Sequence, residues 1–275
     1  MGPVDATAAW AWLRSPAARA GGARPAPADA EAADLLALYG PVATAPGRFA
    51  LAQLGQSLDG CIATRTGDAV HVTGEADREH LHRLRALVDA VLVGVGTVVS
   101  DDPRLTVRSV VGRDPHRVVL DPAARAPLTA RVLSDGAPVT WCVAEAHEAA
   151  ARRAVTGDGP VRVLAVPCDE RRGVDPHDVL DRLADRGLVR VLVEGGGRTV
   201  SRFLRAGALD RLHLSVAPVL LGADGTTGLG VPGPALARDA LRPPSRTFRL
   251  GDDVCFDLDL AAALRTGAPV GQRER

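Results

Sequence analysis

Residues 189–204, VRVLVEGGGRTVSRFL, constrain the fold of this chain more than any other stretch. The apolar, β-branched run before Glu194 predicts a buried parallel strand, and the apolar spacing of Val200, Phe203 and Leu204 predicts a helix. Three glycines join them, so free backbone N–H groups and a helix N-terminus meet at one point. Such a turn can bind an anion, most simply a phosphate, although a glycine-rich turn without a ligand is the plain alternative.

The rest of the chain repeats this order of strand, turn and helix. Strands are expected at residues 49–54, 90–93, 117–120, 138–143, 161–166, 211–216 and 248–260, with helices at 74–88 and 176–186. The last two strands follow one another without a helix, across a glycine- and proline-rich surface excursion at 220–244. This alternation predicts an α/β fold with a mainly parallel sheet and an antiparallel C-terminal edge.

Composition excludes several classes of protein. The 33 basic residues, all arginine, balance 33 acidic ones, so no net field favours nucleic acid or an acidic membrane. The four cysteines lie far apart and lack CxxC spacing, so no disulfide framework is expected. His80 and His82 point to different faces of one helix and cannot share a metal ion, so no metal site is expected either. No apolar run approaches membrane length and no secretory signal is visible, so we expect a cytoplasmic protein.

Residues 1–46 differ in character from the rest of the chain. They are rich in alanine and proline, and they carry two of the three tryptophans, Trp10 and Trp12. Helices are expected around residues 6–20 and 30–38. We therefore divide the chain into a helical N-terminal extension (1–46), a main domain (47–262) and a C-terminal tail (263–275).

Two glycine turns follow buried strands, Gly94-Val95-Gly96-Thr97 and Gly195-Gly196-Gly197. Ligands of open α/β sheets collect beyond the carboxyl ends of the strands, so two such turns can hold the two ends of a pyrophosphate-containing cofactor. Neither turn is a complete dinucleotide fingerprint, and no Walker lysine is present.

Charged residues near these turns are the candidates for substrate chemistry. Glu194 ends a strand and Asp59 lies in a Ser-Leu-Asp-Gly loop, and each side chain either caps its turn or contacts substrate. Asp101 begins the segment DDPRLTVR (101–108). Its first residues either simply cap a turn or, with Arg108, belong to a site where that arginine grips a phosphate or a carbonyl. Arg85 lies on an amphipathic helix, where the pattern alone favours a solvated side chain.

Five motifs in order now identify a resemblance. They are QSLDGCIAT (56–64), HRLRALVDAVLVGVGT (82–97), DDPRLTVR (101–108), RVVLD (117–121) and VEGGG (193–197). Together they resemble the reductase domain of riboflavin biosynthesis, the C-terminal half of a bifunctional pyrimidine deaminase/reductase, over residues 47–260. The resemblance implies a dihydrofolate-reductase-like three-layer fold and a homodimeric, NADPH-dependent reductase. That reductase opens the ribosyl group of a 5-amino-6-ribosylaminopyrimidine 5′-phosphate to ribityl.

The resemblance also implies site residues. NADPH contacts are expected at Gly55, His71, Gly94, Gly96, Thr97, Asp101, Arg125, Gly196, Gly197, Arg198 and Thr199. Substrate contacts are expected at Ala69, Arg85, Leu105, Arg108 and Glu194. Glu194 and Asp59 are the groups expected to polarise or protonate the substrate.

Departures from the family pattern bear on the substrate. Pro167-Cys168 lacks the second cysteine of the deaminase zinc motif, so deaminase activity is not expected. Ala69 replaces a substrate-binding serine and His71 replaces an aromatic residue. Pro122 replaces a serine, which makes Arg125 the candidate for the 2′-phosphate of the cofactor.

Three hypotheses emerge from these patterns. The first is an NADPH-dependent reductase of the riboflavin pathway. The second keeps the cofactor but reduces another pyrimidine, a pteridine or a cyclic imine, as Ala69 and His71 suggest. The third is a nucleotide-binding protein without turnover.

Overall fold

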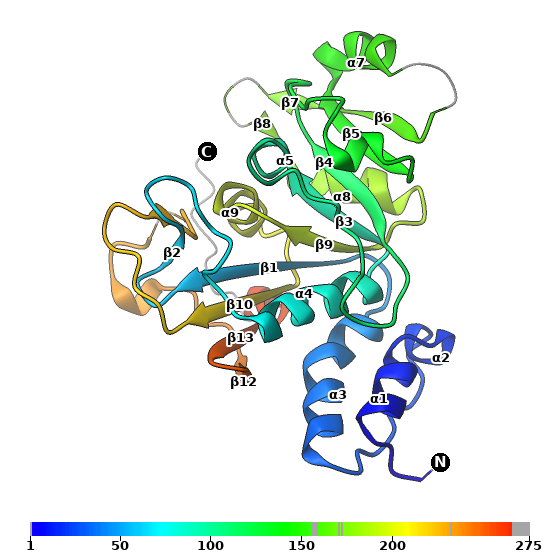
Figure 1. Cartoon of the computed structure of the whole chain (residues 1–275), viewed down its shortest axis with the longest axis vertical. Coiled ribbons are helices and arrows are strands. Elements are labelled where there is room, and N and C mark those ends of the chain that lie inside the picture. Colours follow the sequence, from blue (N-terminus) through cyan, green and yellow to red (C-terminus); the bar gives the residue numbers. More distant parts are fainter. Residues whose placement is uncertain (1, 156–158, 170, 172, 232, 266–275) are drawn as a thin grey trace.

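The computed structural model describes residues 2–155, 159–169, 171, 173–231 and 233–265 (Figure 1). A central sheet has the spatial order β12 (Ser245–Leu250), β13 (Asp253–Asp259), β10 (Arg211–Ala217), β1 (Phe49–Ser57), β9 (Arg190–Glu194), β3 (Ala90–Gly94), β4 (His116–Leu120), β5 (Val139–Ala144), β6 (Val161–Val166). The strands from β10 to β6 run parallel, and β13 and β12 pair antiparallel. The predicted sheet class and its antiparallel edge are confirmed.

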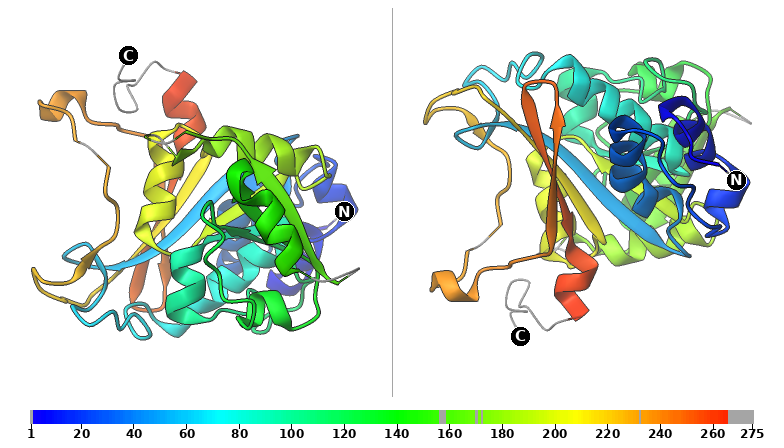
Figure 2. Two further views of the ribbon diagram at one scale, coloured as in Figure 1. Left: turned by 90° about the horizontal axis from the view of Figure 1, so that it is seen from above. Right: turned by 90° about the horizontal axis from the view of Figure 1, so that it is seen from below.

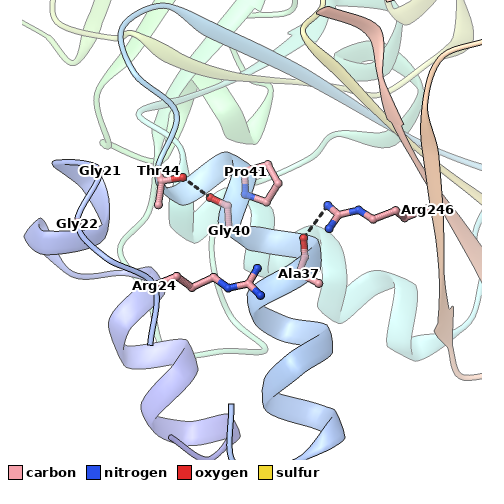
Figure 3. Close-up of a pocket in the computed structure, with 8 residues that line it drawn as sticks. All are labelled: Gly21, Gly22, Arg24, Ala37, Gly40, Pro41, Thr44 and Arg246. Atoms are coloured by element: carbon pink, nitrogen blue, oxygen red, sulfur yellow. Dashed lines mark hydrogen bonds between the residues drawn. The ribbon is translucent and has the colours of Figure 1, made fainter. Parts of the chain in front are cut away.

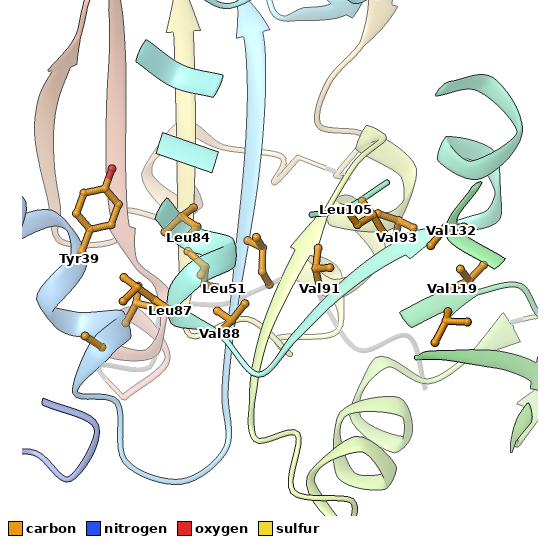
Figure 4. Packing of buried hydrophobic residues seen from close by; sticks show 14 of the residues in the cluster. Tyr39, Leu51, Leu84, Leu87, Val88, Val91, Val93, Leu105, Val119 and Val132 are labelled. Atoms are coloured by element: carbon orange, nitrogen blue, oxygen red, sulfur yellow. The ribbon is translucent and has the colours of Figure 1, made fainter. Parts of the chain in front are cut away.

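Helices cover both faces of the sheet, which explains why central strands such as β3 and β9 are apolar runs. Alternate residues of one strand enter different cores. In β1, Leu51 packs toward α4 (Glu75–Leu87), whereas Ala50 and Ala52 pack toward α8 (Pro176–Ala184) and α9 (Gly197–Arg205). Figure 4 shows Leu51, Leu84 and Val91 in the first of these cores.

Smaller helices complete the layers. α5 (Val95–Asp101), α6 (Arg131–Ser134) and α7 (Glu148–Ala154) contribute to the core that contains α4, and α10 (Leu260–Arg265) contributes Leu260 to the other. A short two-stranded sheet lies apart from the main one and consists of β7 (Cys168–Asp169) and β8 (Gly173–Val174). A 3-10 helix, η1 (Glu145–His147), follows β5. Among the described residues, no helix combines the length and the apolarity that crossing a bilayer requires. Residues 266–275 of the predicted tail lie outside the described residues.

The C-terminal segment differs from the single strand predicted at 248–260. It forms a hairpin, because Gly251 adopts φ +65° between β12 and β13. Before it, the predicted surface excursion contains β11 (Thr226–Thr227) and the 3-10 helix η2 (Ala237–Asp239). β11 pairs with β2 (Cys61–Ala63). Figure 2 shows the chain between β11 and η2 arching away from the body of the molecule.

The N-terminal extension forms α1 (Ala6–Leu13), α2 (Pro16–Arg19) and α3 (Ala30–Ala43). The first predicted helix is broken in two, because Ser15 caps the N-terminus of α2 and Pro16 begins it. Leu36 and Val42 of α3 belong to the same buried cluster as the strands of the sheet. The extension therefore shares its core with the main domain, and the boundary at residue 46 stays a prediction.

A proline inside α3 creates a second attachment. Pro41 has no N–H to donate to the Ala37 carbonyl, and Arg246 of β12 donates to that carbonyl instead, at 2.8 Å. Arg24 donates to the neighbouring Leu36 carbonyl at 3.5 Å. Figure 3 shows both guanidinium groups at a hollow of about 380 Å³ beside the end of the helix. Arg246 thus serves the carbonyl group that the proline leaves without a helical donor.

A buried chain of polar groups joins α3 to the far edge of the sheet. The Tyr39 hydroxyl lies 2.8 Å from Nδ1 of His80, and Nε2 of His80 lies 3.2 Å from Nδ1 of His213. Nε2 of His213 lies 3.3 Å from Asp257, which also accepts two hydrogen bonds from Arg211. The first two contacts are satisfied when the Tyr39 hydroxyl donates to Nδ1 of a neutral His80 and Nε2–H of His80 donates to Nδ1 of His213.

Burial supports this assignment of protons. It lowers the pKa of His80 well below its usual value and raises the pKa of Tyr39. The thiol of Cys255 and one ring nitrogen of each histidine lie within 4.8 Å of one another. The hydrogen bond between the rings occupies one nitrogen of each histidine, and these nitrogens are therefore not open to a metal ion while the bond is formed.

Candidate active site

The two glycine turns lie side by side at the carboxyl edge of the sheet, because β9 and β3 are parallel neighbours. Two threonines join them directly. The Gly196 N–H donates to Oγ1 of Thr97 at 3.1 Å, and Oγ1 of Thr199 lies so close to Gly94 that a Cβ there would come within 2.3 Å of it. The predicted meeting of the two turns is therefore observed.

The glycines of these turns do different things. A Cβ on Gly195, which has φ +100°, would lie 2.6 Å from Thr97, and one on Gly197 would lie 1.6 Å from the Gly228 carbonyl. These glycines, like Gly94, are explained by packing inside the protein. A Cβ on Gly96 would meet no atom within 4 Å, and one on Gly196 would meet only Thr97 at 3.7 Å. Only these two leave open space for a ligand.

A buried ion pair lies beside the turns. Arg85 of α4 donates through Nε to Oε2 of Glu194 at 2.9 Å, and its Nη2 donates to Oε1. Both residues are at least nine-tenths buried. The helix pattern predicted that Arg85 is solvated, and this prediction is wrong. The face of α4 that carries Arg85 is turned toward the end of β9. The pair holds a carboxylate and a guanidinium in fixed positions at the strand end.

The segment after α5 has neither helix nor strand over residues 102–115, and side chains hold its backbone instead. Arg85 Nη1 donates to the Thr106 carbonyl at 2.9 Å, and the Val107 N–H donates to Asp114 at 2.6 Å. The Arg108 N–H donates to Nδ1 of His82 at 3.0 Å. Each of three successive residues thus has its own anchor.

Two candidate substrate residues lie on this segment. Leu105 is buried although its φ is +57°, a conformation that costs free energy in a side chain of this size. Arg108 is exposed, and its guanidinium donates to Thr106 Oγ1 at 2.6 Å. The anchored backbone therefore presents an exposed guanidinium, which can meet an anionic ligand.

Asp59 anchors a loop. Its carboxylate accepts the N–H groups of Leu221 and Gly222, the latter at 2.7 Å, and the hydroxyl of Ser57. The Ser57 hydrogen bond, followed by these backbone N–H groups, lowers the pKa of Asp59, so the side chain is ionised at neutral pH. These contacts are those of a side chain that caps its turn, the first alternative given for Asp59. A role as proton donor would require these hydrogen bonds to break.

The other predicted contacts lie around the same edge. Ala69, His71, Asp101, Arg125 and Arg198 are exposed. Gly55 packs against the start of α4, since a Cβ there would come within 2.6 Å of Thr73, which precedes the helix, and 3.3 Å of Asp77 in it. In the part of the chain that the structure describes, Arg125 forms no ion pair, which leaves its charge available.

Sequence reasoning missed His82. It precedes Arg85 by three residues in α4, so both side chains lie on one face of the helix. That spacing was a usable signal. Burial, followed by the charges of Arg85 and Arg108, lowers the pKa of His82, with Glu194 and the Thr106 backbone opposing the shift.

Comparisons with known proteins show the family of this chain. The profile of the RibD C-terminal domain matches residues 48–250. A Methanothermobacter thermautotrophicus protein named 2,5-diamino-6-ribosylamino-4(3H)-pyrimidinone 5′-phosphate reductase is 37% identical over 214 residues, which are 76% of this chain and 96% of that protein. Riboflavin biosynthesis protein RibD of Aquifex aeolicus is 38% identical over 169 residues, or 61% of this chain and 45% of that relative.

Solved structures give the same result. The structure of Acinetobacter baumannii RibD has a TM-score of 0.64 and 27% identity, covering 83% of this chain and 62% of that one. The chain thus spans less than half of the curated RibD protein above, yet nearly all of the archaeal reductase. The chain belongs to the RibD C-terminal domain family and is an oxidoreductase of the riboflavin-pathway pyrimidine reductase type.

Proposed function

We propose that this protein reduces the ribosyl group of an aminopyrimidine ribosylamine 5′-phosphate to ribityl, with NADPH as the hydride donor. The observation that carries the proposal is the buried pair of Arg85 and Glu194, fixed at the edge of the sheet beside two open glycines. The 96% coverage of an archaeal reductase named for such a substrate supports it.

The carboxyl edge fits a dinucleotide. Gly96 and Gly196 leave room for close approach to the backbone, and the N-terminus of α9 has no side-chain cap on its N–H groups. Arg125, exposed after β4, is suited to the 2′-phosphate that distinguishes NADPH from NADH. When bound, the nicotinamide supplies the hydride, and the protein positions it.

The substrate would lie on the other side of the glycine turns. Glu194 can accept hydrogen bonds from amino or hydroxyl groups of the substrate, while Arg85 keeps this carboxylate oriented. Arg108 is suited to the 5′-phosphate, because its guanidinium is exposed on an anchored backbone. Asp59 contributes through the loop that it holds.

The test monitors oxidation of NADPH at 340 nm with the 2,5-diamino pyrimidinone and with its deaminated counterpart. We expect turnover of at least one, and weaker binding of NADH than of NADPH. If NADPH binds but neither compound is reduced, the second hypothesis takes over, because Ala69 and His71 lie in an exposed loop where the family pattern changes. Binding of NADPH without oxidation by any pyrimidine or pteridine would favour a non-catalytic protein.

We also propose that the protein is a homodimer. Support comes from the sheet edge, where β12 pairs only with β13 among the described residues and Phe256 is 36% exposed. Light scattering after gel filtration distinguishes a dimer from a monomer of 28.6 kDa.

A further inference from the structure

His82 is buried between α4 and the irregular segment 102–115, and neither the pattern of the chain nor the comparisons give it a role. Its Nδ1 accepts the Arg108 N–H at 3.0 Å. An imidazole nitrogen accepts a hydrogen bond only when it carries no proton. The contact therefore requires a neutral ring with its proton on Nε2.

The hydrogen bond from Arg108 to His82 matters because residues 102–115 lie in neither a helix nor a strand and so lack the regular backbone hydrogen bonds of those elements. The anchors at Thr106 and Val107 come from Arg85 and from Asp114. The anchor at Arg108 comes from His82, which lies on the same face of α4 as Arg85. One helix face thus fixes both the carboxylate at the end of β9 and the backbone from which Arg108 extends.

We propose that His82 is a positioning residue for substrate binding: its neutral imidazole holds the backbone at Arg108, so that this guanidinium can engage the substrate phosphate. The proposal rests on the proposed function for the role of Arg108. Protonation of His82 would turn Nδ1 from an acceptor into a donor facing the Arg108 N–H, and the anchor would be lost. The charged groups that face the ring are Arg85, Arg108 and Glu194, of which the two arginines oppose its protonation.

A matched pair of variants isolates this contact. In H82N the amide oxygen takes nearly the place of Nδ1 and can accept the same N–H, whereas in H82Q the polar end lies farther out, near the place of Nε2. We expect H82Q to raise KM for the pyrimidine phosphate roughly tenfold, the effect of one lost hydrogen bond, with kcat changed much less. H82N should recover most of the wild-type KM.

The pH profile gives a second readout. In the wild type, KM for the pyrimidine phosphate should rise on the acid side, in a range below the ordinary pKa of histidine, because burial lowers the pKa of His82. In H82N this limb should be absent, since asparagine does not titrate. Equal KM values for H82N and H82Q, or an acid limb that persists in H82N, would overturn the proposal.

Hydrogen exchange separates this proposal from the proposed function. The Arg108 amide should exchange faster in H82Q than in the wild type, and at close to the wild-type rate in H82N, with α4 protected in all three proteins. This holds whatever the protein reduces. A wild type that turns over no pyrimidine phosphate but shows this pattern refutes the proposed function and keeps the anchor, whereas unchanged exchange in H82Q refutes the anchor.

Discussion

Replacing Glu194 by alanine would leave the Arg85 guanidinium buried without its carboxylate. The side chains of Arg85 and Glu194 are only 7% and 11% exposed, so water can replace little of the lost interaction. Arg85 would keep only its hydrogen bond to the Thr106 carbonyl. Breaking a buried pair in this way costs about 3–5 kcal/mol, a large part of the stability of a typical domain.

A double-mutant cycle measures this interaction directly. Urea unfolding is followed by circular dichroism for Glu194→Ala, for Arg85→Met and for the double variant. We expect a coupling free energy of about 1.5–3 kcal/mol, because the second substitution removes a charge that the first has stranded. The exposed pair Glu148–Arg152 in α7 is the control, with an expected coupling of about 0.3–0.5 kcal/mol.

The same cycle can refute the reasoning. If the coupling between residues 85 and 194 were no larger than that in α7, the pair would not be buried as described. The variant for activity is Glu194→Gln, which keeps the shape of the side chain and loses its charge. It should lower kcat/KM for the pyrimidine phosphate at least about tenfold, and an unchanged value would remove the charge of Glu194 from the mechanism.

Three further outcomes are expected. Tyr39→Phe should lower the free energy of unfolding in urea by about 1–3 kcal/mol, because the buried Nδ1 of His80 loses its hydrogen-bond donor. A change under about 0.5 kcal/mol would contradict the hydrogen bond between Tyr39 and His80. Stability should fall as pH drops below about 6.5, since His80 takes up a proton in the unfolded chain but not in the folded one, and His80→Asn should flatten that slope. Gly96→Ala should leave the melting temperature unchanged yet weaken NADPH binding in a fluorescence titration. Gly195→Ala should lower the melting temperature, because its Cβ would be strained at a positive φ and would meet Thr97. Equal effects of the two substitutions would contradict the distinction between a glycine open to ligand and a glycine required by packing.

The sheet was predictable because its signal is local. Strands such as β3 and β9 are buried on both faces, so they read as apolar runs that end at glycine turns. Their parallel order followed from the helices between them. The hairpin of β12 and β13 was missed, because the turn at Gly251 lies inside a continuous strand-like pattern.

The site was predictable in part. The two turns were expected at one edge, and they meet there through Thr97 and Thr199. The burial of Arg85 was not predictable from its helix, because an arginine in an amphipathic pattern carries no sign of a partner 109 residues away. The contact of His82 with the Arg108 backbone was also missed, although the spacing of His82 from Arg85 indicated that the two side chains share one face of α4.

The sequence by itself determined most of the segments that become strands and helices, and it placed glycines where the chain has to turn tightly, since these choices depend on neighbours along the chain. Only the tertiary structure decided which glycines leave room for a ligand and which simply accommodate a threonine or a carbonyl. It also decided that Glu194 binds an arginine and that Asp59 binds a loop. The physical reason is that a charged or polar group takes its role from the partners that folding brings to it, and these partners come from distant parts of the chain.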